Sequence, residues 1–516
     1  GYMDTIAVLD FGGQTAQLIS RRIRDLGVYS VVLPGTTGCD ELRDPQLKGV
    51  VLSGSPYSVH DEDAPVPDRS LRSLGIPILG ICYGLQQLVH TTGGAIGRAR
   101  SREYGRARLS FENHPLFAHV DQHFTSWMSH GDHVEQLPDG ASVIASSANG
   151  VPAAVELADD VLGIQFHPEV THCEFGSQIL ENFAVGIAGA QKQWSLEDYI
   201  EQSSSDIRSS VGDTPVLLLI SGGVDSTVVA ALLLHALPPE QVYLMYVDTG
   251  LMRKDETVQV TESLSALGAM HIDIIDAADR FLYSLSGVAD PEQKREIIGD
   301  LFMTIQQTEI ARGLEGDYFL AQGTLYTDLI ESGAGVGKMA QVIKSHHNVR
   351  SPLVQAKREA GEIIEPLSRL YKDEVRRVGQ LLGVDDAVIR RHPFPGPGLA
   401  VRILGAVDGE KCRILREADA IYIEELRSRG LYDKIWQAFA VLLPTRSVGV
   451  TGDARNYGYV AALRAVTSSD GMTADVYPFQ ASDILEISAR ITNEVPEVGR
   501  VVYDVSSKPP ATIEWE

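Results

Sequence analysis

The chain has 516 residues, with 69 Asp or Glu against 44 Lys or Arg, so its formal charge at pH 7 is −25. A surface this acidic repels phosphate backbones, and we expect no nucleic acid and no membrane as a partner. Hydrophobic residues make up 44% of the chain and charged residues 22%, which excludes a mostly disordered protein. The length predicts about three domains.

The cysteine content and the apolar runs indicate a cytoplasmic protein. Four cysteines without paired spacing argue against a disulfide scaffold and favour a reducing compartment. The richest apolar runs, such as 228–234, are far shorter than the about 18 residues that a membrane-spanning helix needs. Residues 1–30 have no basic start followed by an apolar block, so no signal peptide is predicted.

The first third of the chain alternates short apolar runs with helical patterns. Leu18, Ile19 and Ile23 share one face of a helix predicted over 14–26. Strands separated by helices favour a mostly parallel sheet, and functional groups collect at the carboxyl ends of such strands. The predicted strands are 5–9, 50–52, 77–81 and 162–166.

The same alternation returns after a polar helix over 197–207, which predicts a second α/β domain. Three prolines and two glycines in 392–398 then predict a hinge or linker, and a helix over 412–429 follows it. The predicted fold class is therefore α/β, with two mostly parallel-sheet α/β domains before a smaller α+β dimerisation domain. Their bounds are 4–193, 194–391 and 392–516.

Cys82 lies between two glycines, in Gly80-Ile81-Cys82-Tyr83-Gly84, after a predicted strand and before a helix. The glycines permit the sharp turn of a nucleophile elbow, and the positive start of the helix favours the thiolate. His167 and Glu169 follow another predicted strand, where residues two apart project to the same side. The pattern predicts a cysteine nucleophile with an oriented histidine base, although a lone cysteine is more often a small buried side chain.

A metal site is the alternative for this part of the chain. Neither candidate cluster has the i, i+4 spacing of a helical zinc motif, and a metal would leave the elbow unexplained. The two clusters are His167, Glu169, His172 and Cys173, and His130, Asp132 and His133.

A loop rich in glycine and serine follows the predicted strand 216–220 and precedes an apolar helix. Free N–H groups, hydroxyls and the helix dipole make such a loop an anion site, although an ordinary connection is the alternative. Asp225 could hold Mg²⁺, and Lys344 and Lys372 could neutralise phosphate, although such charges taken singly are more often solvated. The residues predicted to bind ATP are Ser221, Gly222, Gly223, Val224, Asp225, Ser226 and Thr227, with Lys344 and Lys372.

These motifs carry a family resemblance over almost the whole chain. Residues 4–190 contain LDFGGQ, LSGSP, GICYG, WMSHGD and QFHPE in the order found in class I glutamine amidotransferases. The string SGGVDS resembles the signature of the N-type ATP pyrophosphatases. With IKSHHN, HPFPGPGL, RSVGV and KPPATIEWE further on, the chain resembles the GMP synthetases.

For the amidotransferase part, the resemblance implies that Cys82 attacks glutamine, His167 transfers protons and Glu169 orients His167. It also implies an oxyanion site at the backbone N–H groups of Ser55 and Tyr83. Ser55 stands where the family usually has glycine, so a positive φ at this position would cost energy. The implied glutamine-binding residues are Gln86, Ser129, His130, Gly131 and Asp132.

For the rest of the chain, the resemblance implies that ATP adenylates O2 of xanthosine monophosphate (XMP) and that ammonia displaces AMP to give GMP. It further implies Mg²⁺ and a homodimer formed through the C-terminal domain. The implied XMP-binding residues are Arg295, Arg455, Lys508 and Glu514.

Two other functions fit parts of this pattern. A glutamine-dependent amidotransferase could adenylate a different acceptor with the same two motifs. A nucleotide-binding or glutamine-sensing protein without catalysis is the second alternative, but a binding protein has no use for a thiol nucleophile.

Overall fold

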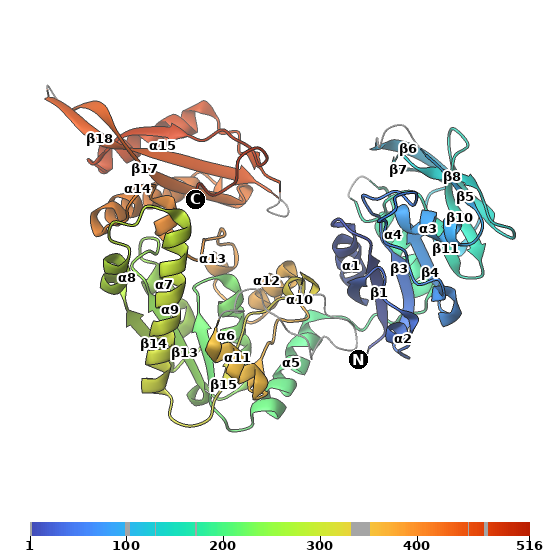
Figure 1. The fold of residues 1–516 in the computed structure, drawn as a ribbon, viewed down its shortest axis with the longest axis horizontal. Coiled ribbons are helices and arrows are strands. Elements are labelled where there is room, and N and C mark those ends of the chain that lie inside the picture. Colours follow the sequence, from blue (N-terminus) through green and yellow to red (C-terminus); the bar gives the residue numbers. More distant parts are fainter. Residues whose placement is uncertain are drawn as a thin grey trace. The chain divides into compact units, whose positions relative to one another are not determined.

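A computed structural model of the chain describes residues 3–98, 104–129, 131–170, 173–331, 351–451, 454–468 and 473–516. Two compact units contain them, residues 1–199 with 325–349 and residues 200–324 with 350–516 (Figure 1). The Gly-rich stretch with Lys344 lies outside the described residues.

The first unit is built on a nine-stranded sheet in the order β2-β1-β3-β4-β11-β10-β9-β6-β7. The pairs from β2 to β11 are parallel and the pairs from β11 to β7 are antiparallel. The prediction of a mostly parallel sheet is therefore right for only half of it. The strands are β1 (Thr5–Asp10), β2 (Tyr29–Pro34), β3 (Leu47–Leu52), β4 (Ile78–Ile81), β6 (Tyr104–Phe111), β7 (His123–Ser129), β9 (Ser142–Ser147), β10 (Pro152–Ala158) and β11 (Val161–Ile164).

The antiparallel half follows from short connections. Only residues 148–151 join β9 to β10, and only residues 159 and 160 join β10 to β11. A parallel pair needs a crossover of about a dozen residues or more, so these connections force antiparallel pairing. The short strands β5 (Ala95–Gly97) and β8 (His133–Gln136) form a separate antiparallel pair.

Helices cover the parallel half of this sheet. Helix α1 buries Ile19 and Ile23 of its predicted apolar face together with Ala16, whereas the third predicted residue, Leu18, is only half-buried. The other helices of the unit are α2 (Cys39–Leu42), η1 (Leu71–Leu74), α3 (Tyr83–Thr91), η2 (Pro115–Phe117), α4 (Gly176–Glu181), the π-helix η3 (Asn182–Ile187) and α10 (Tyr326–Glu331), after α1 (Thr15–Asp25).

The second unit contains a five-stranded sheet in the order β14-β13-β12-β15-β16, and every pair in it is parallel. This sheet confirms the predicted second α/β fold. Its strands are β12 (Val216–Ile220), β13 (Val242–Asp248), β14 (His271–Asp276), β15 (Phe319–Ala321) and β16 (Ile363–Ile364).

The helices around this sheet differ in how much of their surface is apolar. Helix α6 is apolar on all sides and almost wholly buried, whereas the long α9 starts at the side-chain cap of Asp290. The predicted helix 197–207 is α5, which continues to Val211. The helices are α5 (Leu196–Val211), α6 (Val224–Ala236), η4 (Pro239–Gln241), α7 (Glu256–Ala266), α8 (Ala278–Ser284), α9 (Pro291–Gly313), α11 (Pro352–Glu359), α12 (Lys372–Leu381) and α13 (Asp386–Ile389).

A mixed sheet forms the last part of the same unit. Strand β17 pairs antiparallel with β18, which also pairs with β19 and, in parallel, with β20. Helices α14 and α15 accompany it, so the predicted α+β character is present. The elements are η6 (Gly398–Arg402), α14 (Gly409–Ser428), η7 (Tyr432–Lys434), β17 (Gln437–Thr451), β18 (Ala454–Thr467), β19 (Asp475–Val476), α15 (Ala481–Glu494) and β20 (Val498–Tyr503).

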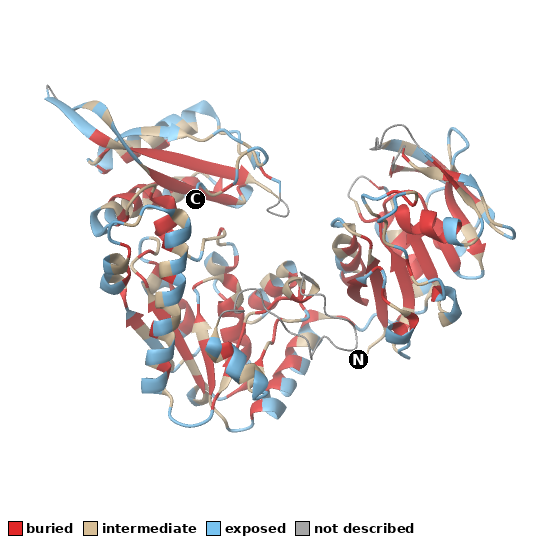
Figure 2. Ribbon diagram, in the orientation of Figure 1, coloured by how far each residue is buried: buried red, intermediate tan, exposed pale blue. Residues whose placement is uncertain are grey.

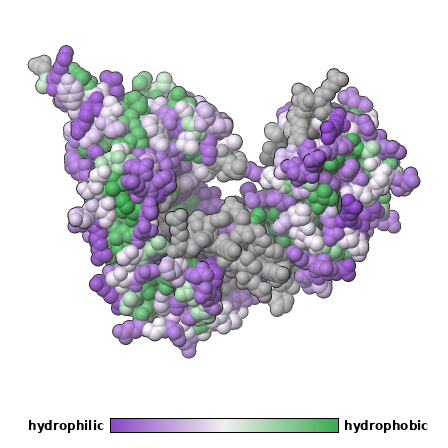
Figure 3. All heavy atoms as spheres, viewed as in Figure 1, coloured by the Kyte–Doolittle hydropathy of each residue, from purple (hydrophilic) through white to green (hydrophobic). Residues whose placement is uncertain are grey.

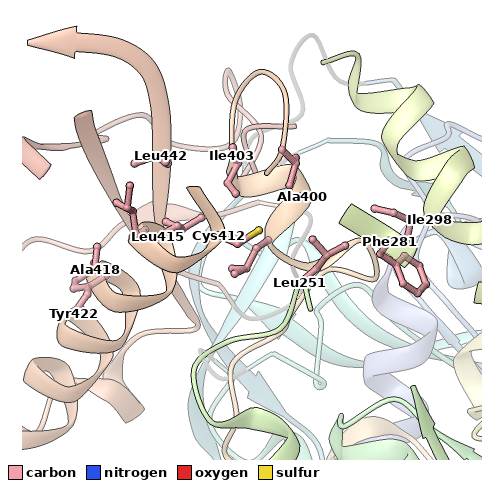
Figure 4. Packing of buried hydrophobic residues seen from close by; sticks show 14 of the residues in the cluster. Leu251, Phe281, Ile298, Ala400, Ile403, Cys412, Leu415, Ala418, Tyr422 and Leu442 are labelled. Carbon is pink, nitrogen blue, oxygen red and sulfur yellow. The ribbon is translucent and has the colours of Figure 1, made fainter. Parts of the chain in front are cut away.

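One hydrophobic core continues across the predicted linker 392–398. It joins residues such as Leu251 and Phe281 with Ile403, Leu415 and others beyond the linker (Figure 4). His392 is buried, its ring stacks on that of Tyr432 at 3.8 Å, and burial lowers its pKa to about 4. The segment is therefore packed into the second unit and is not a free hinge.

Burial follows the sheets in both units, where the strands are mostly buried and the outer helix faces exposed (Figure 2). On the face drawn in Figure 3, hydrophilic side chains predominate, as the charged composition leads one to expect. Within the described residues, no helix is both long and apolar enough to cross a membrane.

Candidate active site

The turn between β4 and α3 has the geometry of a nucleophile elbow. Cys82 stands between the last strand residue and the first helix residue with φ 51° and ψ −105°, a conformation that non-glycine residues rarely adopt. A Cβ on Gly84 would lie 2.4 Å from the carbonyl oxygen of Leu52, and one on Gly80 would lie 2.7 Å from the Gly84 backbone. Both glycines are needed because the backbones approach so closely.

The sheet brings His167 to the same edge as Cys82. Strand β11 pairs in parallel with β4, and the Cys82 N–H donates to the carbonyl oxygen of Ile164 at 2.7 Å. His167 follows three residues later, with an exposed fraction of only 6%. The predicted meeting of these two residues at a carboxyl strand edge therefore agrees with the topology.

A buried carboxylate orients the imidazole. Glu169 has no exposed surface, and its Oε1 lies 2.8 Å from Nδ1 of His167. Burial by itself lowers the pKa of His167, but hydrogen bonds to Cys82 and Glu169 and the charges of both groups raise it to about 10. The arrangement thus favours an imidazolium beside the sulfur, which is the form that supports a thiolate.

Gln165 is a further polar contact of the thiol that the sequence analysis did not single out. Its Nε2 donates to Sγ of Cys82 at 3.4 Å, and its Oε1 accepts from Gln86 at 3.4 Å. Gln165 is the first residue of the motif QFHPE, and this position is the sequence signal that could have identified it. Gln165 ties the sulfur to Gln86, one of the predicted substrate residues.

The loop with Ser55 lies beside His167. A Cβ on the neighbouring Gly54 would lie 3.2 Å from Cε1 of His167. The Ser55 hydroxyl donates to the carbonyl oxygen of Phe11 at 2.7 Å and accepts from the Tyr57 N–H at 3.1 Å. Ser55 is not among the described residues with positive φ, so the expected strain of serine at this position is absent. Tyr83 is the first residue of α3, where backbone N–H groups are free of helical partners.

Part of the predicted glutamine-binding set lies together. Nε2 of Gln86 donates to the carbonyl oxygen of Asp132 at 2.9 Å, and the Ser58 hydroxyl donates to the Asp132 carboxylate. Gly131 is buried next to Asp132, and Ser129 ends β7. His130 lies outside the described residues.

The Gly- and Ser-rich loop connects β12 to α6 as predicted. Gly222 has φ +85°, which glycine adopts without strain, and α6 begins at Val224 after Gly223. The Ser226 hydroxyl accepts from the Ser221 N–H at 3.2 Å, and the Thr227 hydroxyl donates to the carbonyl oxygen of Gly223 at 3.0 Å. These bonds fix the loop at the positive end of a 13-residue helix.

Lys372 reaches this loop from the start of α12. Its Nζ lies 2.6 Å from Oδ1 of Asp225, and both side chains are partly exposed. A lysine and a carboxylate at the mouth of an anion-binding loop suit ATP phosphates and a cation between them. Lys344, the other predicted cation, lies outside the described residues.

Arg391 also holds the loop, although the sequence analysis did not select it. Its guanidinium donates to the carbonyl oxygen of Gly222 and to the carboxylate of Glu256. Burial raises the pKa of Glu256 against the lowering effect of Arg391. The only sequence signal for Arg391 is its position directly before 392–398. The loop that it contacts lies 169 positions away, so no local pattern connects the two.

The predicted XMP residues fall into two places. Arg295 donates to the carbonyl oxygen of Glu516, and Glu514 accepts from Arg402, so these residues lie on or against the segment 506–516. Lys508 exchanges two backbone hydrogen bonds with Ala474, next to β19. Arg455 lies at the opposite end of β18, where it is exposed and paired with Val450.

The metal alternative gains no support from the described residues, among which no three His, Cys, Asp or Glu side chains are grouped as ligands. His130 and His172 lie outside them.

Comparisons with known proteins cover the chain from end to end. Residues 7–187 match the class-I glutamine amidotransferase family, residues 202–290 the asparagine synthase family and residues 424–515 the GMP synthase C-terminal domain. The chain is 50% identical to the glutamine-hydrolysing GMP synthase of Thermosipho africanus over 100% of both chains. It is 48% identical to that of Aquifex aeolicus over 99% of both, and 49% identical to that of Chlorobium chlorochromatii over 100% of both. With this identity and coverage, the chain belongs to the family of glutamine-hydrolysing GMP synthases.

Proposed function

We propose that Cys82, His167 and Glu169 hydrolyse glutamine and that the loop Ser221–Thr227 binds the ATP that adenylates XMP. The observation that carries the proposal is the elbow, where a cysteine with φ 51° lies at the same sheet edge as a buried His–Glu pair. A binding protein would have no reason to hold a cysteine in a strained conformation beside an oriented imidazole.

In the first reaction, the Cys82 sulfur attacks the carboxamide carbon of glutamine and His167 gives a proton to the departing ammonia. A thioester to Cys82 remains, and water attacks it with His167 accepting the proton, so that glutamate leaves. The backbone N–H groups of Ser55 and Tyr83 are proposed to stabilise the oxyanion. Gln86, Ser129, His130, Gly131 and Asp132 are proposed to bind the amino-acid end of glutamine.

In the second reaction, O2 of XMP attacks the α-phosphorus of ATP and pyrophosphate leaves. Ammonia then replaces AMP at the purine carbon, which gives GMP. Residues 221–227, Lys344 and Lys372 are proposed to bind the phosphates. Asp225 fits Mg²⁺, which commonly takes one or two carboxylates together with substrate phosphates, and the bound ion would neutralise phosphate charge.

We also propose that Arg295, Lys508 and Glu514 bind XMP in one chain and that Arg455 is contributed by a second copy. Arg455 is eleven positions along β18 from Val466, which pairs with β19 near Lys508. At about 3.3 Å per residue, the two ends of the strand are about 36 Å apart, too far for one nucleotide.

The tip of the β17–β18 hairpin supports the proposed homodimer. Val448 is paired with Tyr457, and Val450 is paired with Arg455, so all four side chains lie on one face. The three apolar ones are 46%, 65% and 72% exposed for Val448, Tyr457 and Val450. Apolar side chains gathered this way at an exposed tip suit a contact with a second chain.

The domain bounds 4–193, 194–391 and 392–516 remain our proposal for the functional division of the chain. We further propose a cytoplasmic location, because all four cysteines are free and buried.

The test is to incubate the protein with XMP, ATP, Mg²⁺ and glutamine and to quantify AMP, pyrophosphate and GMP. Equal amounts of all three are expected. AMP without GMP would contradict the use of ammonia on this acceptor. The absence of all three, with ammonium replacing glutamine as well, would refute XMP as the acceptor.

A further inference from the structure

The segment 506–516 contains no helix or strand, yet buried cations from three different elements hold it. Lys294 of α9, Arg402 of η6 and Arg464 of β18 each have no exposed surface. Charged side chains are almost never fully buried unless they are paired. This segment is therefore part of the fold and not a frayed tail.

Two of the three cations contact backbone carbonyl oxygens or the side chain of the last residue. Arg464 donates to the carbonyl oxygens of Ile513 at 3.2 Å and Thr512 at 3.1 Å, and also to that of Ser506. Lys294 donates to the carboxylate of Glu516 at 3.0 Å and to two carbonyl oxygens of η6 and its C-cap. They fix the path of the segment.

Arg402 differs because the carboxylate that it contacts belongs to Glu514, one of the proposed XMP-binding residues. Its Nη2 donates to Oε1 at 2.8 Å and its Nε to Oε2 at 3.3 Å, a two-point contact that fixes direction as well as distance. Gln437 donates to the same Oε1 at 2.7 Å. The Glu514 side chain nevertheless stays 24% exposed, so it is not sealed in the interior as Arg402 is.

The guanidinium of Arg402 has cation–π contacts with two aromatic rings, but one of its nitrogens has no hydrogen-bond partner among the described residues. Its guanidinium lies 4.0 Å from the ring centre of Phe439 and 5.0 Å from that of Phe394. Its Nη1 is buried, with no hydrogen-bond partner among the described residues. An apolar side chain of similar volume between two aromatic rings would avoid this desolvation, and replacing buried ion pairs in this way is often neutral or stabilising.

We propose that Arg402 is a positioning residue for XMP: it acts through Glu514, whose carboxylate it holds at the orientation that binds the nucleotide. This inference rests on the proposed function, in which Glu514 binds XMP.

The experiment is a double-mutant cycle of Arg402→Met and Glu514→Gln in the full chain, with KM for XMP and for ATP measured separately. Arg402→Met is expected to raise KM for XMP roughly tenfold or more, the loss typical of a charge-assisted contact, and to leave KM for ATP within about twofold. In the Glu514→Gln background the same substitution is expected to add almost nothing, because its route to XMP is already lost. Arg402→Lys keeps the charge without the fork and is expected to restore part of the affinity.

The outcomes separate this inference from the proposed function. If Glu514→Gln leaves KM for XMP unchanged, the assignment of Glu514 fails. If Glu514→Gln raises KM for XMP but Arg402→Met does not, or if the two effects multiply, the positioning role is overturned while Glu514 stands. If Arg402→Met does not fold, the cycle is run with Arg402→Lys. An equal rise in KM for XMP and ATP in that variant would show a general structural role and refute the proposal.

Discussion

Glu169→Gln is the substitution that tests the triad most directly. It keeps the size of a fully buried side chain and removes only its charge. The imidazole of His167 then loses the carboxylate 2.8 Å from its Nδ1. We expect glutamine-driven turnover to fall and ammonium-driven turnover to remain, because the second reaction does not use this residue.

The structure sets the size of the effect. The rise in the pKa of His167 from 6.5 to about 10 corresponds to about 5 kcal/mol in favour of the imidazolium. Glu169 shares that stabilisation with Cys82, so the loss of its charge should lower the pKa of His167. The loss of an oriented acid and base should slow glutamine hydrolysis by about 100-fold or more.

The substitution should also cost some stability. The Oε2 atom of Glu169 is buried without a hydrogen-bond partner among the described residues. An amide nitrogen at that position would be an unpaired donor, at a cost of about 1–3 kcal/mol. The variant is therefore expected to fold.

The assay compares glutamate release with ammonium-driven GMP formation across pH 6 to 10.5. In Glu169→Gln, the alkaline limb of the glutaminase profile should move to lower pH. Glu174→Gln is the matched control, because Glu174 is exposed and its carboxylate accepts from the Thr125 N–H at 2.9 Å. A wild-type glutaminase rate with an unmoved alkaline limb in Glu169→Gln would refute the reasoning.

Three further predictions follow from the same structure. Cys82→Ala should abolish glutamine-driven GMP formation and spare ammonium-driven formation; loss of both in a steady-state assay would show that Cys82 is needed for folding or coupling. Gly84→Ala puts a Cβ 2.4 Å from the Leu52 carbonyl oxygen, and this clash should destabilise the first unit by about 1–3 kcal/mol. Urea unfolding measures the loss, and an unchanged midpoint would contradict the prediction. Lys372→Gln removes a cation from the proposed phosphate site, so KM for ATP should rise. The lost ion pair is partly exposed and worth at most about 1 kcal/mol, so the unfolding midpoint should stay the same. An unchanged KM would exclude Lys372 from the phosphate site.

The raised pKa of His167 also predicts how pH acts on the stability of the first unit. Because the folded pKa lies above the unfolded value of 6.5, the stabilisation from the charged imidazole is complete below pH 6.5 and is lost as pH rises toward 10. Chemical unfolding at pH 6 and pH 9.5 measures it. Glu169→Gln should reduce this loss, and an identical pH dependence in the variant would contradict the prediction.

Local sequence was sufficient for the elements that carry chemistry. The strand 216–220 and the glycine turn after it were predictable because a buried apolar run and a loop of Gly and Ser are local signals. The elbow at Cys82 was predictable for the same reason. The antiparallel half of the first sheet was not, because pairing direction depends on which strands meet and not on the composition of each strand.

By itself, the sequence therefore determined the two motif-bearing strand ends, the residue types of the triad and the acidic, globular character of the chain. Three features are visible only in the tertiary structure. Arg391 donates to the loop at Gly222, and Arg402 donates to the carboxylate of Glu514. The residues of 392–398 are packed in a shared core. Those contacts join positions more than 100 residues apart, and long-range pairs leave no periodicity in the chain. A buried arginine and a solvated one have the same letter, and only the packing around the side chain distinguishes them.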